Sequence, residues 1–141
     1  MKRVLMPLCG AVIVLVTSCE SSHENSIRNS PGLAGTEWKL SAWSANSLDP
    51  AQFTITAAFD DSRISGTSAV NSYSGAYSTT PSGNFSVAEL QATMMGGSDD
   101  AMRVESMYFE LLSQTRKFTL NQTTLTLLDR DNNPLLVFAK R

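Results

Sequence analysis

The sequence predicts an α+β fold that is mostly β, with one helix packed against a sheet. Apolar and polar residues alternate in several short stretches separated by turn-forming residues, which is the pattern of half-buried antiparallel strands. A single stretch, 99–112, carries apolar residues at helical spacing and follows a good N-cap, Ser98. The length of 141 residues, 42% hydrophobic and 17% charged, suits one globular domain.

The first strands are expected at 37–42 and 53–59, where every second residue is apolar. In the first of them Ala42 should point inward together with Trp38 and Leu40. Asp60-Asp61-Ser62 should form the turn to a return strand, because adjacent carboxylates in a strand would point to opposite faces and could not act together as a catalytic or cation-binding pair.

The stretch 66–77 is the most particular part of the chain, because turn-forming residues and two tyrosines stand among small residues. Gly66 and Gly75 can adopt backbone angles closed to other residues, and Asn71 tolerates the left-handed region. We expect a tight strand, turn and strand unit here.

The remaining elements follow in order. A hairpin connection at 78–83 should lead into a strand at 84–90, and the paired glycines within 91–97 should break the pattern before the helix. Further strands are expected around 118–120, 125–127 and 135–138. The last of these is apolar on both faces, which predicts a strand covered on each side.

The helix should carry an apolar stripe that packs against the sheet, across the open side of a barrel. The stripe comprises Ala101, Val104, Tyr108, Leu111 and Leu112, and is widened by Met102, Met107 and Phe109. Asp99 and Asp100 favour the positive end of the helix dipole. Glu105 is expected on the helix surface, paired with a neighbour.

The N-terminus is typical of an export signal. Lys2 and Arg3 precede an apolar run, 4–16, that is too short for a membrane span and holds a proline and a glycine. Its exit, Val16-Thr17-Ser18-Cys19, resembles the lipobox of bacterial lipoproteins, in which the cysteine is acylated and becomes the new N-terminus. Simple cleavage that leaves Cys19 as a free thiol is the alternative, which an oxidising compartment disfavours.

These features divide the chain into a signal peptide at 1–18, a lipidated N-terminus and polar tether at 19–32, and a domain at 33–141. The tether holds the only histidine, His23. By resemblance to enteric lipoproteins, Glu20 after the anchor favours the outer membrane, facing the periplasm, over the inner membrane. Removing 1–18 leaves nine basic residues against 13 acidic ones, a net charge of −4 that argues against nucleic acid as a partner.

Two parts of the sequence contain residues that could bind a metal ion. Asp129 to Asn133 has oxygen donors spaced as in a calcium loop, but Pro134 and Lys140 stand where glycine and glutamate are required, so a polar turn is expected. Thioether sulfurs could hold Cu(I), but without histidine or cysteine nearby, core packing is the favoured interpretation. The methionines concerned are Met94, Met95, Met102 and Met107.

Enzymatic activity is not expected. Ser68, Ser72 and Ser74 lack a histidine or lysine to activate them in the domain, and known nucleophile motifs are missing from the sequence. An enzyme that uses carboxylates of Asp60, Asp99 or Glu105 is the weaker alternative.

The order and spacing of several marks resemble the META domain of the bacterial HslJ-type proteins. They are Leu33-x-Gly35-Thr36-x-Trp38-x-Leu40, Phe59-Asp60, Gly66 to Tyr77, Thr93-Met94-Met95, a helix with Glu105 and Leu112, and Leu125-Thr126-Leu127. Members of this family often carry cysteine where this chain has Val70 and Gly97, so Val70 should fill the space apolarly.

The resemblance implies a small, partly open antiparallel β-barrel or curved sheet with one helix against it. It also implies a non-enzymatic, lipid-anchored envelope protein, monomeric and without a cofactor or metal, that has a structural or stress-related role and binds an envelope protein. The alternative is a carrier or pilot-like chaperone that holds an acyl chain or apolar peptide between helix and sheet. A binding site is expected around Asn71, Tyr73, Tyr77, Thr93 and Met95. The rival interpretation is that these residues only brace the barrel.

Overall fold

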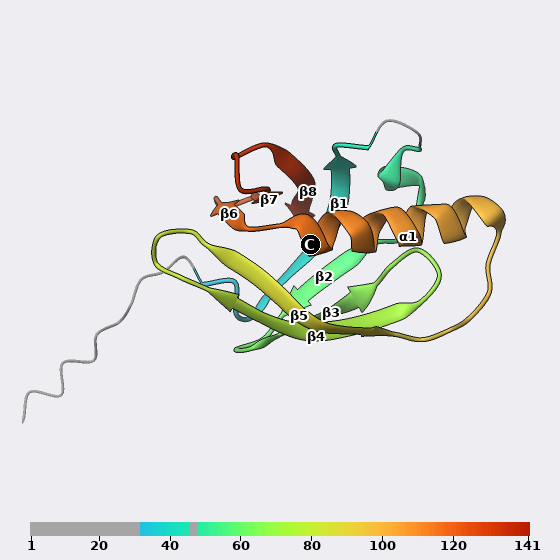
Figure 1. Ribbon diagram of the computed structural model, residues 1–141, viewed down its shortest axis with the longest axis horizontal. Helices are drawn as coiled ribbons and strands as arrows, with labels where there is room; N and C mark the ends of the chain where they lie inside the picture. The colour runs from blue at the N-terminus through green and yellow to red at the C-terminus, as the bar shows by residue number, and fades with distance from the viewer. Residues whose placement is uncertain (1–31, 46–47) are drawn as a thin grey trace, which may run out of the picture.

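Residues 32–45 and 48–141 are described in a computed structural model of the chain (Figure 1). The signal peptide, Cys19 and nearly all of the tether therefore lie outside the described residues. The elements are β1 (Thr36–Trp43), a 3-10 helix η1 (Pro50–Gln52), β2 (Thr56–Phe59), β3 (Arg63–Thr67), β4 (Ser72–Thr79), β5 (Phe85–Ala92), α1 (Asp99–Gln114), β6 (Lys117–Leu120), β7 (Thr124–Leu128) and β8 (Pro134–Lys140).

The eight strands form one antiparallel sheet in the order β5-β4-β3-β2-β1-β8-β7-β6. Its two edge strands meet at one end only, where an isolated bridge joins Asn84 to Lys117. The Phe85 amide donates to the Arg116 carbonyl at 2.8 Å, and the Phe118 amide donates to the Gly83 carbonyl at 2.9 Å. The sheet is thus a partly open barrel, and the predicted fold class is confirmed.

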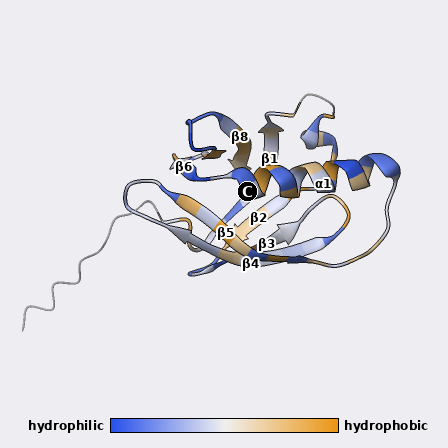
Figure 2. Cartoon of the chain, in the orientation of Figure 1, coloured by the Kyte–Doolittle hydropathy of each residue, from blue (hydrophilic) through white to orange (hydrophobic). Residues whose placement is uncertain are grey.

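Helix α1 lies across the opening between the two halves of the curled sheet (Figure 1). Ser98 caps it by accepting a hydrogen bond from the Ala101 amide, as expected. Its buried face, and the strand residues that it covers, form a single apolar core. The hydrophilic colour at the start of the helix in Figure 2 marks the acidic first turn. The largest fully buried side chains are Trp38, Tyr108, Phe138, Leu40, Ile55, Ile64, Leu112, Leu125, Leu127 and Leu136.

One expected core position is wrong. Ala42 is exposed, although Trp38 and Leu40 are buried as predicted. The register against β8 shifts between Leu40 and Ala42, so the alternation of the strand is interrupted at that point. A β-bulge of this kind reverses which side chains face the core, and period-two reasoning does not foresee it.

The central hairpin turns at Ser68 to Asn71, where the Ser68 amide donates to the Asn71 carbonyl at 2.8 Å. The left-handed position in this turn is taken by Ala69, with φ of 80°, and not by a glycine. Gly66 and Gly75 lie inside β3 and β4. Their role is therefore to leave space, since neither has a positive φ.

Gly75 illustrates this spatial role. It faces a bulge in β5, where Glu89 has a positive φ of 53° and the register shifts between Ser74 and Ala76. A Cβ atom at position 75 would lie 2.9 Å from the Ala88 carbonyl oxygen and 3.0 Å from a Leu90 methyl group.

Gly75→Ala is therefore expected to lower the free energy of unfolding by about 1–3 kcal/mol, because the bulge must shift to admit the methyl group. Gly96→Ala is the matched control, since nothing lies within 4 Å of its Cβ position. Urea unfolding of both variants measures the difference. Equal effects at the two positions would contradict a spatial role for Gly75.

Candidate functional site

Three of the five predicted site residues come together in the fold. Asn71 ends the central turn, and Thr93 and Met95 lie in the segment between β5 and α1. Tyr73 lies nearby but is buried in the core, and Tyr77 lies further along β4. Thr93 and Met95 bond to the Asn71 carboxamide, which bonds in turn to the carboxylate of Glu105 on α1. Glu105 is only 7% exposed.

We call Ser68, Asn71, Thr93, Glu105 and the backbone of Met95 the polar cluster. The Asn71 amide donates to Glu105 Oε2 at 2.8 Å, and Asn71 Nδ2 donates to Glu105 Oε1 at 2.7 Å. The Ser68 hydroxyl lies 2.6 Å from Glu105 Oε2 and 2.9 Å from the Asn71 carbonyl. The carboxylate is thus held by the turn of the β3–β4 hairpin.

The carboxamide of Asn71 makes the four hydrogen bonds that such a group can form. Besides its bond to Glu105, Nδ2 donates to the Met95 carbonyl at 3.2 Å. Oδ1 accepts from the Thr93 hydroxyl and from the Met95 amide, both at 2.7 Å. Asn71 therefore fastens three pieces of chain together: the central turn, the segment that precedes α1, and α1 itself.

Electrostatically, Glu105 is a buried carboxylate held in its charged form. Burial by itself would raise the pKa of Glu105, but the hydrogen bonds from the Ser68 hydroxyl and from the Asn71 side chain and backbone outweigh it and leave the pKa below its ordinary value. The expected surface position of Glu105 is wrong. The signal was present in the sequence, because position 105 falls inside the apolar stripe of Ala101, Val104 and Tyr108.

Next to the polar cluster, two buried tyrosines meet by their hydroxyl groups. Tyr73 donates to the Thr56 carbonyl at 2.8 Å, and its oxygen lies 2.6 Å from that of Tyr108. Since the single hydrogen of Tyr73 is used on Thr56, Tyr108 is the donor within the pair. Burial raises the pKa of both tyrosines well above the ordinary value, so both stay neutral.

This chain of donors predicts unequal effects. Tyr73→Phe leaves the Tyr108 hydroxyl without an acceptor and removes the bond to Thr56, so a loss of about 2 kcal/mol of unfolding free energy is expected. Tyr108→Phe leaves only an acceptor unfilled, and a loss of about 1 kcal/mol or less is expected. Thermal unfolding of the two variants tests the order, and a larger loss for Tyr108→Phe would refute the assigned direction.

Tyr77 lies in β4, and its hydroxyl contacts the turn between β2 and β3. Its hydroxyl donates to the Asp60 carbonyl at 2.6 Å, while Asp60 Oδ1 accepts from the amides of Ser62 and Arg63. These backbone bonds lower the pKa of Asp60, and partial burial raises the pKa of Tyr77. The expected turn at Asp60 is confirmed, and Tyr77 braces it.

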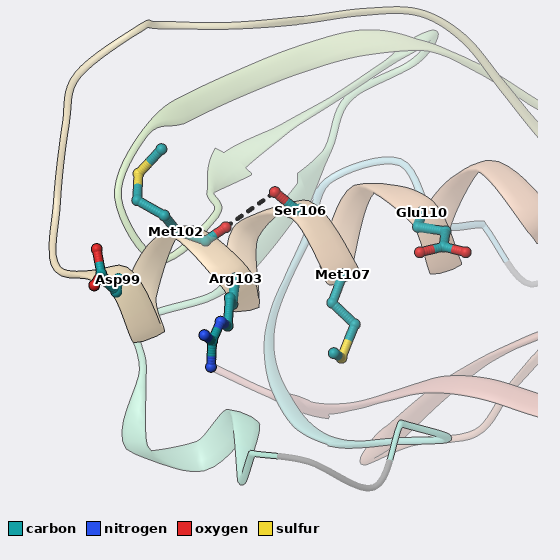
Figure 3. Close-up of a pocket in the computed structure, with 6 residues that line it drawn as sticks. All are labelled: Asp99, Met102, Arg103, Ser106, Met107 and Glu110. Atoms are coloured by element: carbon teal, nitrogen blue, oxygen red, sulfur yellow. Dashed lines mark hydrogen bonds between the residues drawn. The ribbon is translucent and has the colours of Figure 1, made fainter.

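The surface hollows are open. A groove follows the exposed side of α1 past Arg103, Met107 and Glu110 (Figure 3). A more apolar hollow lies between β5 and the helix, at Leu90, Gln91, Ala92 and Phe109, and measures 240 Å³. Sites for small-molecule ligands usually have a volume of about 300–1,000 Å³.

The calcium-loop pattern forms the expected turn, because Asp129 Oδ1 accepts from the amides of Asp131 and Asn133. Within 32–45 and 48–141, no group of three or more His, Cys, Asp or Glu side chains could hold a metal ion. The same part of the chain has no helix with the length and hydropathy to cross a bilayer.

The expected core packing of the methionines is wrong for three of the four. Met94, Met95 and Met102 are 99%, 65% and 38% exposed, whereas Met107 packs against the core. Helical spacing could not predict whether Met94 and Met95 are buried, since both residues precede the helix. Val70, in contrast, is placed as predicted: a Cβ atom at Gly97 would lie 2.8 Å from its Cγ2.

The half-barrel and its helix define a class of small, mostly β domains. The family model for the META domain matches residues 31–141. The chain belongs to the META domain family.

Solved structures share the fold. A protein from Burkholderia xenovorans, determined by NMR, is 24% identical with a TM-score of 0.65, and the match covers 77% of this chain and 83% of that one. A DUF4847 family protein from Bacteroides vulgatus, determined by crystallography, is 13% identical with a TM-score of 0.56, over 77% and 94% of the two chains. A search of curated proteins gives no match.

Proposed function

We propose that this chain is a non-enzymatic envelope protein, anchored by lipid on Cys19 in the outer membrane, whose META domain binds an envelope protein partner. Membership of the META family and the lipobox-like sequence before Cys19 support this proposal. We further propose that the protein has a structural or stress-related role in the envelope.

The side chains of the polar cluster have no free polar group with which to act on a substrate. Ser68 is completely buried, and its hydroxyl is hydrogen-bonded to Glu105. The polar side-chain atoms of Asn71 and Glu105 are hydrogen-bonded to each other and to neighbouring residues. In the described part of the chain, every buried side-chain nitrogen or oxygen has a hydrogen-bond partner. A substrate would have to displace these bonds, so the cluster is suited to bracing the fold, and binding is left to the surface.

The lipid anchor has a direct test with a matched control. Cys19→Ser should abolish labelling of the chain by an alkynyl palmitate analogue and release the protein from the membrane fraction. Cys9→Ser should leave both unchanged, because residue 9 belongs to the segment that is removed. Labelling that survives Cys19→Ser would overturn the anchor.

The partner is tested by photo-crosslinking of the anchored chain in cells. A photoreactive residue at Met94, which is 99% exposed, samples the helix-start end of the domain, and one at Ser82 samples the exposed connection between β4 and β5. A discrete adduct containing a second envelope protein is expected from one of these positions. Failure of both to yield a protein adduct would contradict the partner-binding proposal.

The carrier function is the second candidate, favoured only by the apolar hollow between Leu90 and Phe109. That hollow is smaller than the usual ligand site, and Tyr108 and Leu112 fill the space beneath α1. Native mass spectrometry of the purified chain decides between the two candidates. An adduct of lipid or peptide mass that is lost on denaturation would favour the carrier, and an unliganded mass would favour the partner-binding protein.

A further inference from the structure

The large apolar side chains that are exposed in the described residues are all methionines: Met94, Met95 and Met102. An exposed leucine or phenylalanine is ordinary on a protein surface, yet every leucine, isoleucine and phenylalanine of 32–45 and 48–141 is buried or half-buried. What sets the exposed positions apart is therefore a shared chemical group. Each carries a thioether, which two-electron oxidants convert to a sulfoxide.

The fold holds these residues without using their thioethers. The amide and the carbonyl of Met95 both bond to the Asn71 carboxamide, at 2.7 and 3.2 Å. The Met102 amide donates to the Ser98 carbonyl at 2.9 Å, as part of the first turn of α1. Met94 is almost completely exposed. A sulfoxide at Met94 or Met95 would place its polar oxygen in water and break none of these bonds, so oxidation there should leave the fold intact.

Met107 supplies a contrast within the same domain. It is half-buried and packs against the apolar core, where a sulfoxide oxygen would have to be desolvated. Oxidants usually react first with accessible thiolates, but the two cysteines of the chain are Cys9 and Cys19, both outside the domain. Within 33–141, methionine is the only sulfur-containing residue, and its most accessible members lie at the segment before the helix.

We propose that Met94 and Met95, with Met102 as a slower third position, are sites of reversible sulfoxidation by two-electron oxidants such as hypochlorous acid or hydrogen peroxide. With hypochlorous acid, a sulfur lone pair forms the new S–O bond as the O–Cl bond breaks, and chloride and a proton leave. The sulfur is oxidised by two electrons. A methionine sulfoxide reductase restores the thioether, because two of its thiols become a disulfide and the oxygen leaves as water. This modification is independent of the proposed partner-binding function.

The test is the rate of oxidation at each methionine of the folded chain. The full chain, with its cysteine thiols blocked by N-ethylmaleimide, is treated with hydrogen peroxide, digested with trypsin and analysed by mass spectrometry. Met94, Met95 and Met102 fall in the peptide Ile64 to Arg103, and Met107 falls in the peptide Val104 to Arg116. Met94 and Met95 should react at least about fivefold faster than Met107, and the four rates should converge in urea. Equal rates at Met94 and Met107 in the folded chain would overturn the proposal.

Leucine variants test how much oxidant these positions consume, since leucine keeps an apolar side chain of similar size without sulfur. The double variant Met94→Leu with Met95→Leu should consume about two molar equivalents less in the fast phase of the reaction. Met107→Leu should leave the fast phase unchanged. A fast phase that survives in the double variant would contradict the assignment.

Reversibility is tested on the folded, oxidised chain. Its urea midpoint should equal that of the untreated chain, and reductases for the two sulfoxide epimers, supplied together, should return the peptide Ile64 to Arg103 to its original mass. The same peptide, recovered from cells exposed to hypochlorous acid, should carry sulfoxide that disappears after the oxidant is removed. A shifted midpoint, sulfoxides that the reductases cannot reach, or a peptide that stays unmodified in challenged cells would overturn the proposal.

Discussion

Glu105→Ala is expected to lower the free energy of unfolding by about 3 kcal/mol or more. Without the carboxylate, three buried donors each lose a charge-assisted hydrogen bond. They are the Asn71 amide, one hydrogen of the Asn71 carboxamide and the Ser68 hydroxyl. Glu105→Gln keeps the shape but places an amide donor among these donors, so it should cost about 2 kcal/mol. Urea denaturation measures both losses.

Glu110→Gln on the same helix is the matched control, because Glu110 is exposed, and a change within about 0.5 kcal/mol is expected. Hydrogen exchange adds a local readout. In the Glu105 variants the Met95 amide, bonded to Asn71, should exchange faster than in the unmodified chain. If Glu105→Ala were as mild as Glu110→Gln, the polar cluster would not be the brace that its geometry indicates.

The same carboxylate makes stability depend on pH. The pKa of Glu105 in the folded chain lies below its ordinary value of 4.5, so in acid the unfolded chain takes up a proton before the folded chain does. The contribution of Glu105 is therefore complete above the unfolded pKa and is lost as the pH falls through the folded pKa. A plot of unfolding free energy against pH should fall more steeply in this acid range for the unmodified chain than for Glu105→Gln.

Most of the fold could be predicted from local patterns. Alternation indicates β1, β2, β6 and β7, the Asp60 turn indicates β3, and the Ser98 cap indicates the start of α1, because these signals come from residues adjacent in sequence. The predictions of the strands failed where pairing with a neighbouring strand determines the backbone conformation. The bulges at Ala42 and Glu89 depend on the register of β8 and β4, and the positive φ of Ala69 is imposed by the hairpin around it.

The site was predictable only in part, for a similar reason. The family pattern indicates Asn71, Thr93 and Met95, but the sequence does not indicate Glu105, which bonds to Asn71, because a charged residue on a helix usually faces water. Its burial is explained by three donors of the central turn: the Asn71 amide and carboxamide, 34 residues away in sequence, and the Ser68 hydroxyl, 37 residues away. The helical period places position 105 on the buried face, but it does not reveal the distant donors that make burial of a carboxylate favourable.

Val70→Cys combined with Gly97→Cys is expected to form a disulfide that ties the central turn to the segment before α1. The Cβ positions of the two residues lie 3.6 Å apart, within the range of about 3.5–4.5 Å found in disulfides. The cross-link closes a loop of about 28 residues, so chain entropy predicts that the oxidised form is more stable than its own reduced form by about 3–4 kcal/mol.

Urea unfolding with and without reductant measures that difference, and mass spectrometry identifies the bond. Both positions fall in one tryptic peptide, Ile64 to Arg103, whose mass should drop by two hydrogens on oxidation. The single variants are the controls. Gly97→Cys alone should destabilise the chain, because its Cβ meets Val70 Cγ2 at 2.8 Å, and neither single variant can form the bond. A double variant that stays reduced under oxidant would mean that Val70 and Gly97 are not neighbours, and with them the placement of the whole segment beside Asn71 would be wrong.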